Sequence, residues 1–167
     1  NDGTPILVTN AGKMTLQPDG SYQAYTDCGR EKTGVDVFEW AVRAAELGAG
    51  EIVITSVDRE GTGKGFDLEL TRRVAESVSI PVIACGGAGG ISHVREVIQD
   101  GKADAVCLAS CLHYEFIQNH AQHDDCFASE GNTEFLRRQT TFSRIESVPL
   151  PTIKQALDSH HIDCRWN

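Results

Sequence analysis

Short apolar runs alternate along the chain with stretches in which apolar residues recur at helical spacing. The runs at 51–57, 80–85 and 103–109 are dominated by β-branched and small apolar residues, which is typical of parallel strands buried on both faces. Helical periodicity separates them, at about 36–48, 67–78 and 92–99. The pattern predicts a parallel sheet with crossover helices.

The first 48 residues predict a strand with a hairpin extension and then a helix. Pro5–Thr9 and Tyr22–Thr26 are apolar runs, and the turn-forming residues 17–20 lie between them. Asp36 is placed to cap the helix, with Glu39 three residues later completing a capping box. The apolar stripe expected to face inward is Val37, Trp40, Ala41, Ala44 and Ala45, and Gly48 is expected to end the helix.

Beyond this, Asp67 is the expected N-cap of a helix whose Leu70, Val74 and Val78 face inward. Residues from about 114 to 149 are polar and rich in His, Asn and Gly, which breaks the rhythm of strands and helices. We therefore expect an insertion at about 114–149. A helix at 151–157 and a short extended piece at 162–165 are expected after it.

The composition is that of an ordinary globular domain, with 40% hydrophobic and 23% charged residues. The net charge of −9 would repel nucleic acid and anionic membrane surfaces, so neither is expected as a partner. No apolar run approaches the roughly 20 residues that span a bilayer, and we expect a soluble, cytoplasmic protein. The six cysteines form no CxxC pair, so reduced thiols are expected.

Glycine and small polar residues follow the expected strands at their carboxyl ends, the edge of a parallel sheet where ligands bind. Gly86 and Gly87 open a glycine-rich turn before a helix, where backbone amides can converge on an anion. Ala109 and Ser110 follow the next strand. Together the two turns match the phosphate site that barrel enzymes build from their last two loops. A tight turn needed only for packing is the alternative explanation for the glycines.

The loop after the strand at 51–57 carries Asp58, Glu60 and Thr62, two carboxylates and a hydroxyl suited to acid/base work or to binding sugar hydroxyls. A solvated turn is the alternative. The cationic residues Lys13, Arg30, Lys32 and Lys64 form either a rim that attracts phosphate or separate solvated charges.

Two other kinds of site are not expected. Incidental histidines in a polar insertion explain the possible zinc ligands better than a metal site does; these are His113, His120, His123 and Cys126. Nucleophilic catalysis by Cys28 or Cys111 is not expected either, because the sequence identifies no partner that would lower a thiol pKa. We expect no metal and no cofactor.

Three segments, 48–62, 83–89 and 103–110, closely resemble the cyclase subunit of imidazole glycerol phosphate synthase, in the same order. The resemblance extends from about Tyr25, through Thr26–Gly29, to residues 153–165, and only the insertion has no clear counterpart. It implies an α/β fold, half of a (β/α)8 TIM barrel. That fold has about four parallel strands with crossover helices, a hairpin extension and a C-terminal insertion, in one half-barrel domain over residues 1–167.

The family is a lyase of histidine biosynthesis. It combines ammonia from a glutaminase subunit with a phosphoribulosyl-formimino aminoimidazole carboxamide nucleotide, and it yields imidazole glycerol phosphate and the aminoimidazole nucleotide. By resemblance, Gly86, Gly87 and Ser110 hold one substrate phosphate, and Ala109 supplies backbone. Thr26 and Gly29 line the pocket, beside Asp58 and Thr62. Glu60 stands where the family generally has an aspartate, and Glu51 resembles a gate residue at the ammonia entrance.

The family uses two aspartates as its acid/base pair, one on the first barrel strand, which this chain lacks, and one on the fifth, where Asn10 stands. An amide cannot transfer a proton as a carboxylate does. A closed barrel also needs eight strands in about 250 residues, so two parallel edges are expected to be unpaired. Either an N-terminal half is missing or two copies associate about a twofold axis, and the latter is favoured for this chain alone.

Three functions remain open. The first is the cyclase reaction with a glutaminase partner, and the second is a related phosphoribosyl isomerase of histidine synthesis. The glycine turn and the terminal segment favour the cyclase over the isomerase. The third is a catalytically silent half-barrel that binds phosphorylated ligands and self-associates, which Asn10 favours.

Overall fold

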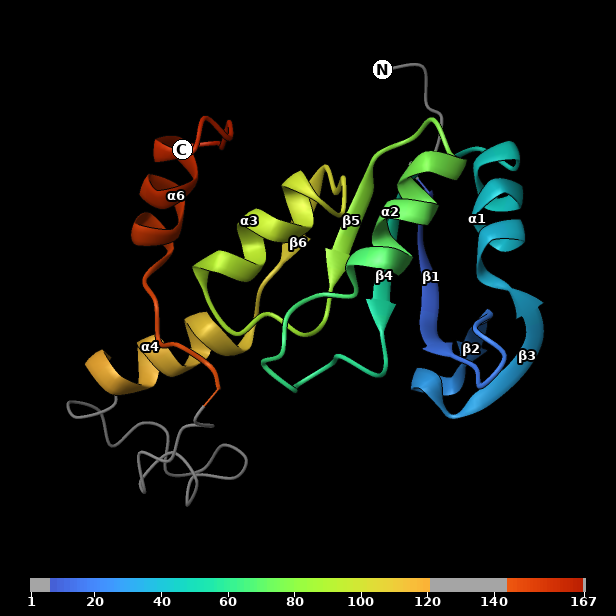
Figure 1. The fold of residues 1–167 in the computed structure, drawn as a ribbon, viewed down its shortest axis with the longest axis horizontal. Coiled ribbons are helices and arrows are strands. Elements are labelled where there is room, and N and C mark those ends of the chain that lie inside the picture. The colour runs from blue at the N-terminus through green and yellow to red at the C-terminus, as the bar shows by residue number, and fades with distance from the viewer. Residues whose placement is uncertain (1–6, 121–143, 167) are drawn as a thin grey trace.

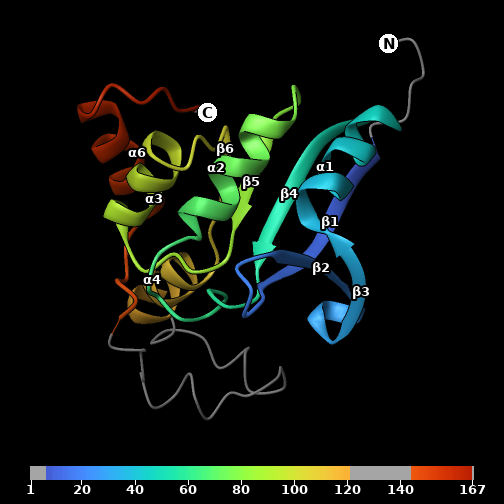
Figure 2. The same cartoon turned by 45° about the vertical axis from the view of Figure 1, so that its right-hand side comes forward.

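A computed structural model describes residues 7–120 and 144–166 of the protein. These residues form a six-stranded sheet in the order β3-β2-β1-β4-β5-β6, with α1, α2 and α3 on one face (Figures 1 and 2). The strands are β1 (Leu7–Leu16), β2 (Tyr22–Thr26), β3 (Glu31–Asp36), β4 (Ala49–Ser56), β5 (Val82–Cys85) and β6 (Ala105–Cys107). The helices are α1 (Val37–Glu46), α2 (Leu68–Ser77), α3 (Ile91–Gln99), α4 (Ser110–His120) and α6 (Leu150–Ser159), and a 3-10 turn, η1, spans Asp27–Gly29.

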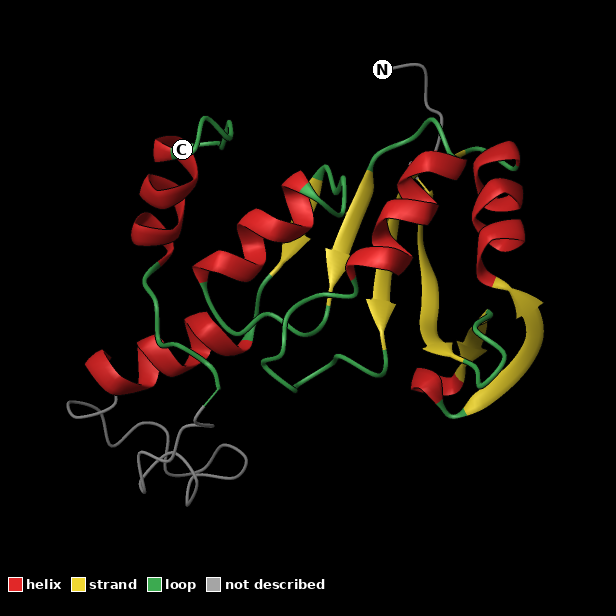
Figure 3. Cartoon of the chain, in the orientation of Figure 1, coloured by secondary structure: helices red, strands yellow, loops and turns green. Residues whose placement is uncertain are grey.

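β1, β4, β5 and β6 run parallel, and α1, α2 and α3 lie in the crossovers between them (Figure 3). Since all three helices cover the same face, the arrangement is that of part of a (β/α)8 barrel, as the sequence predicts. β6 is shorter than the apolar run at 103–109. The first two residues of this run precede β6 and form other backbone hydrogen bonds. The Ala103 amide donates to the Val97 carbonyl of α3 at 3.0 Å, and the Asp104 amide donates to the Val82 carbonyl at 2.9 Å.

The hairpin extension is also present and is larger than expected. The turn after β1 closes with a hydrogen bond from the Gly20 amide to the Gln17 carbonyl at 2.9 Å, and β2 then pairs antiparallel with β1. β3 adds a further antiparallel strand that the sequence analysis did not predict, because most of its residues are exposed and give no apolar alternation. The expectation of two unpaired parallel edges is therefore wrong on one side: β2 covers β1 along Lys13–Leu16.

Two aspartates begin the helices at the predicted positions. Asp36 accepts hydrogen bonds from the Phe38 and Glu39 amides at 2.8 and 3.1 Å, and Asp67 accepts from the Leu70 amide at 3.1 Å. Such caps satisfy amides that have no partner within the helix. One predicted core position is wrong, since Trp40 is 37% exposed whereas Val37, Ala41 and Ala44 are buried.

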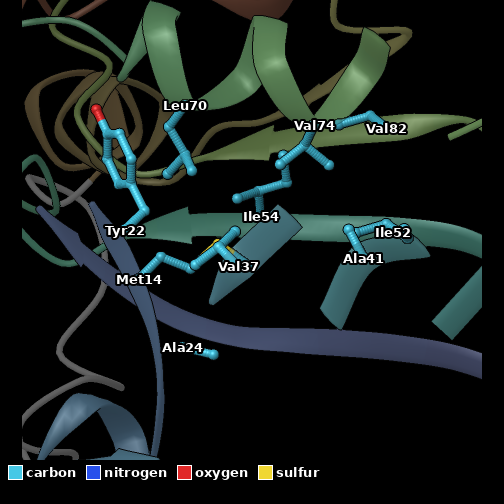
Figure 4. Packing of buried hydrophobic residues seen from close by; sticks show 10 residues of the cluster. All are labelled: Met14, Tyr22, Ala24, Val37, Ala41, Ile52, Ile54, Leu70, Val74 and Val82. Atoms are coloured by element: carbon cyan, nitrogen blue, oxygen red, sulfur yellow. The ribbon is translucent and has the colours of Figure 1, made fainter. Parts of the chain in front are cut away.

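Two apolar clusters hold the helices against the sheet. The first lies between β1, β2, β4, β5, α1 and α2 (Figure 4) and consists of Met14, Tyr22, Ala24, Val37, Ala41, Ile52, Ile54, Leu70, Val74 and Val82. The second joins β5 and α3 to α6 through Ala84, Val94, Val97, Ile153 and Leu157. The buried residues Ile52, Ile54, Val82 and Ala84 lie on the face of β4 and β5 that packs against the helices. The alternate residues of these strands therefore face the opposite side.

The C-terminal part departs from the expected boundaries. α4 continues to His120, so residues 114–120 of the segment set apart as an insertion are helical; residues 121–143 lie outside the described residues. α6 confirms the helix expected at 151–157. Ile162 and Cys164 belong to no strand and pack against the second cluster. Among the described residues, no helix has both the length and the apolar character to cross a bilayer.

Candidate phosphate-binding site

The glycine-rich turn after β5 has a backbone that side chains would disturb. Gly86 and Gly87 have φ values of +89° and +104°, in the left-handed region that favours glycine. A Cβ on Gly87 would lie 2.2 Å from the Gly65 carbonyl oxygen and 2.9 Å from Cβ of Arg59. The Gly65 amide in turn donates to the Gly87 carbonyl at 2.8 Å. The loop after β4 is therefore packed directly against this turn.

The second predicted turn contacts the first. α4 begins at Ser110, and the Ala109 carbonyl accepts the hydrogen bond of the His113 amide at 2.9 Å, so Ala109 directly precedes the first helical turn. Buried Cys111 donates its thiol to the Ala88 carbonyl at 3.7 Å. This contact joins the start of α4 to the glycine turn. Amides in the first turn of a helix carry a partial positive charge, so this junction is suited to an anion.

One amide of the glycine turn is already used within the protein. The Gly89 N–H donates to Nδ1 of His93, in the first turn of α3, at 3.0 Å. Gly89 also lies close to Gly63 and Arg144, whose carbonyl oxygens a Cβ at this position would meet at 2.4 and 2.6 Å. The far end of the turn is thus fixed by packing, as the alternative explanation of the glycines requires. An anion would have to be bound nearer Gly86 and Gly87.

Asp58 and Thr62 stabilise the loop after β4. One carboxylate oxygen of Asp58 accepts from the Leu16 amide at 2.9 Å and ties this loop to the end of β1. The Thr62 hydroxyl donates to the Arg59 carbonyl at 2.7 Å and accepts from the Lys64 amide at 3.3 Å. These contacts give both predicted pocket residues a structural role. The sequence could not show this for Asp58, because its partner is 42 residues away.

Glu60 is the loop carboxylate that lies beside the glycine turn. Its backbone amide donates to the Ser56 carbonyl at 3.0 Å, and a Cβ built on Gly86 would be 3.5 Å from its Cα. Its side chain is exposed. A carboxylate in this position can transfer protons to and from a ligand bound at the carboxyl ends of β4 and β5.

The other predicted residues lie farther along the sheet. Asn10 is on β1, with its backbone opposite Val53 of β4, and its side chain lies outside the described part of the chain. Glu51 is half-buried near the start of β4, at the end of the sheet opposite the phosphate turns. Thr26 and Gly29 are at the end of β2 and in η1, on the far side of β1 from β4. No described contact joins these four to the glycine turn.

The proposed cationic rim is divided between two regions. Arg30 and Lys32 are on the hairpin, where Arg30 lies 3.8 Å from the Asp27 carboxylate. Lys64 is in the loop after β4, and the side chain of Lys13 is outside the description. The alternative of separate solvated charges therefore fits the described residues better.

The structure describes the side chains of some of the candidate metal ligands and thiol nucleophiles. His113 is exposed, with its ring centroid 5.9 Å from that of Tyr114. The other possible ligands fall where side chains are not described, namely His120, His123 and Cys126. Burial raises the pKa of Cys111, which disfavours the thiolate that a nucleophile needs. Cys28 is exposed on η1.

A cavity of about 710 Å³ lies beside the phosphate turns rather than within them. Its lining includes Asp58, Arg59, Lys64 and Asp67, of which Asp58 was a predicted pocket residue and Lys64 a predicted rim cation. At its edge the Tyr22 hydroxyl donates to Asp67 at 3.1 Å. Burial, followed by the neighbouring Asp67 charge, raises the pKa of Tyr22 to about 12. This tyrosine therefore stays neutral and holds the hairpin to the start of α2.

Residues that the sequence analysis missed make the contacts between the turns. Gly63 and Gly65 pack against the glycine turn, and Cys111 joins α4 to it. The Cβ of Arg59 lies beside Gly87. The alternation of glycine over 61–65 is a signal that could have identified the loop as a close-packing partner. The Cys111 contact has no local signal, because it joins residues 23 positions apart.

Comparison of the sequence with known proteins places the chain in a family. The family model described as "Histidine biosynthesis protein" matches residues 10–118, more than half of the chain. The imidazole glycerol phosphate synthase subunit HisF of Alkaliphilus metalliredigens (strain QYMF) is 52% identical over 96 residues. That alignment covers 58% of this chain and 38% of the relative, so the chain spans well under two thirds of the relative's length.

A solved structure also aligns with part of the chain. It is the crystal structure of (S)-3-O-geranylgeranylglyceryl phosphate synthase from Thermoplasma acidophilum in complex with its substrate sn-glycerol-1-phosphate. It is 23% identical, with a TM-score of 0.36, and the alignment covers 41% of this chain and 27% of that chain. The family itself follows from the sequence match over residues 10–118: this chain belongs to the histidine biosynthesis protein family.

Proposed function

We propose that this chain is the C-terminal half of a cyclase subunit of the imidazole glycerol phosphate synthase type, a lyase of histidine biosynthesis. The proposed reaction uses ammonia from a glutaminase subunit to convert the phosphoribulosyl-formimino aminoimidazole carboxamide nucleotide to imidazole glycerol phosphate. The observation that carries the proposal is the contact of Cys111 with the Ala88 carbonyl, which brings two predicted phosphate turns together. The similarity to a HisF subunit supports it.

In this proposal the phosphate is bound by backbone amides and a hydroxyl. Gly86 and Gly87 approach it without side chains, and Ser110 offers both its hydroxyl and the amide-rich start of α4. Ala109 supplies only backbone, which agrees with its exposed position before the helix. The net charge of −9 makes such a local device necessary, since the field of the whole protein repels a phosphorylated substrate.

Proton transfer is assigned to Glu60, whose carboxylate follows β4 and lies beside the glycine turn. Asn10 occupies the position at which the family has an aspartate, and its amide cannot serve as an acid or base. Glu51 is at the opposite end of β4, where a gate for ammonia and a docked glutaminase would be. The proposed activity therefore depends on groups that a second half-barrel supplies.

The apolar residues on the face of the sheet opposite the helices support the proposal of a second half-barrel. Val53 and Ile83 are opposite each other in the register of β4 and β5, alternate with the buried core residues, and are half-exposed. In a closed barrel such residues fill the interior. Either an N-terminal half-barrel or a second copy of the chain would cover them.

A silent phosphate-binding half-barrel that self-associates is the second candidate. Asn10 favours it, because a carboxylate is absent at the position where the family has one. The two candidates predict the same phosphate site but different turnover, so one experiment separates them.

That experiment measures turnover of the nucleotide substrate with an ammonium salt, by chromatography of both products. The chain is assayed alone and after mixing with the N-terminal half of a HisF subunit. Turnover in the mixture that Glu60→Gln lowers and Asn10→Asp raises supports the cyclase. No turnover in any sample, with phosphate binding intact, rejects the cyclase and leaves the silent half-barrel.

The phosphate site is tested separately by titrating the chain with inorganic phosphate and following the ³¹P resonance. Ser110→Ala removes one hydrogen bond to a charged ligand, worth about 1.5–3 kcal/mol, so affinity should fall roughly tenfold or more. Ser77→Ala, at the far end of α2, is the matched control and should bind as the unchanged chain does. Equal affinity of all three proteins would show that phosphate binds elsewhere.

A further inference from the structure

Cys85 and Cys107 are direct neighbours on the two last parallel strands. They are partners in the register of β5 and β6, as are Ala84 and Val106 before them. Ala84 and Val106 pack into the cluster beneath α3 and α6, so the two cysteines are on the opposite face of the sheet. Both side chains therefore project to the same side from adjacent backbone positions.

The spacing of the two cysteines suits a disulfide. Neighbouring strands are about 4.8 Å apart, and disulfides join residues whose Cα atoms are about 4.4–6.8 Å apart. β6 is only three residues long and is the last strand of the described sheet, so it is paired on one side. It can make the small movement that a bond between the sulfurs requires.

The two thiols are on adjacent positions of neighbouring strands and can be reached by a small molecule. Both are free, Cys107 is exposed and Cys85 is half-exposed. Burial, followed by the charge of Cys85 and a hydrogen bond with it, raises the pKa of Cys107. Thiol–disulfide exchange needs the thiolate of only one cysteine of such a pair, because the second sulfur completes the exchange from the neighbouring strand. Either cysteine can therefore be the attacking group of the pair.

The other described cysteines lack this arrangement. Cys111 is buried and donates to the Ala88 carbonyl, and Cys164 donates to the Lys154 carbonyl at 3.5 Å. Cys28 is on η1, at the opposite side of the sheet from β6.

We propose that Cys85 and Cys107 form a dithiol that a small-molecule disulfide oxidises to an intramolecular disulfide bond. The thiolate of one cysteine attacks one sulfur of the oxidant, which breaks the oxidant's S–S bond and releases one thiol. The sulfur of the other cysteine then attacks the mixed disulfide, loses its proton and displaces the second thiol. In total the protein loses two protons and two electrons, which the oxidant gains as it becomes two thiols.

The test exposes the 167-residue chain to oxidised glutathione and locates bonds by mass spectrometry after blocking free thiols and digesting with trypsin. Cys85 is in the peptide 74–95, and Cys107 is in the peptide 103–137. We expect a link between these peptides and a mass loss of two hydrogens, both reversed by dithiothreitol. The link should persist in Cys111→Ser and be absent in Cys85→Ser and Cys107→Ser.

Two outcomes would overturn the proposal. One is that the peptides remain unlinked while glutathione adds singly to the exposed thiols. The other is that the link survives Cys107→Ser, which would assign the bond to another cysteine of the 103–137 peptide.

A second measurement does not depend on oxidation. Phenylarsine oxide binds stably only where two thiols are adjacent, so the unchanged chain and Cys164→Ser should bind it. Cys85→Ser and Cys107→Ser should not, with far-ultraviolet circular dichroism confirming that each variant is folded. Equal binding by all four proteins would refute the pairing. Neither measurement involves phosphate or turnover, so failure of the proposed function leaves this result standing.

Discussion

Replacing Gly87 with alanine would test how the loop after β4 and the glycine turn fit together. At φ +104° an added Cβ meets two separate obstacles: the left-handed backbone itself and the Gly65 carbonyl oxygen 2.2 Å away. The first costs about 1–2 kcal/mol. The second forces the loop outward, which weakens the 2.8 Å bond from the Gly65 amide to the Gly87 carbonyl and costs about 1 kcal/mol more.

Overpacking of the displaced loop adds about 1–2 kcal/mol, so Gly87→Ala should lower the free energy of unfolding by about 3–5 kcal/mol. Gly20→Ala is the matched control, because Gly20 also has a positive φ of +84° but nothing within 4 Å of its Cβ position. Gly20→Ala should lower the free energy of unfolding only by the cost of the left-handed backbone, about 1–2 kcal/mol.

Urea unfolding followed by circular dichroism measures both variants against the unchanged chain. If Gly87→Ala loses no more stability than Gly20→Ala, the steric contact with Gly65 does not exist in solution. The loop and the turn would then be independent, and the packing that brings Glu60 to the glycine turn would lose its support.

Two further changes test the contacts that hold the sheet to its surroundings. Tyr22→Phe removes a hydrogen bond to the charged carboxylate of Asp67 and should cost about 1.5–3 kcal/mol in urea unfolding at neutral pH. Because the folded pKa of Tyr22 is raised to about 12, its contribution is complete below the unfolded value of about 10 and is lost as pH rises through 12. The unchanged chain should therefore lose stability in that range more steeply than Tyr22→Phe, and parallel curves would contradict this. Asp104→Ala removes the carboxylate that accepts from the Val82 amide at 2.8 Å, and faster hydrogen exchange of that amide, with a loss of about 1–3 kcal/mol, is expected. Unchanged exchange at Val82 would show that the bond does not form.

Local signals account for most of what the sequence predicted correctly. Asp36 and Asp67 begin their helices by binding amides three residues away or nearer, so the information is within one helical turn. The parallel strands were recognisable because their residues are apolar on both faces. Trp40 was misplaced because its spacing fits the apolar stripe only approximately, and the smaller Ala41 and Ala44 fill the interface instead.

The contacts that assemble the candidate site could not be predicted from local sequence signals. The bond from Leu16 to Asp58 and the contact of Cys111 with Ala88 join segments that meet only after the sheet forms. The sequence did not predict β3, because an exposed edge strand needs no apolar alternation. The sequence therefore predicts which turns could bind phosphate, whereas their mutual contact depends on strand order.

The hairpin formed by β2 and β3 restricts how a further strand can join the sheet. β2 is paired with Lys13–Leu16, so an incoming strand beside β1 can extend only along the preceding part, Leu7–Asn10. β6, at the other end of the sheet, offers three residues. If a second half-barrel joins the sheet as proposed, it can pair with the backbone only beside the amino-terminal half of β1 and along β6. Most of the contact would then come from interior side chains rather than from backbone pairing.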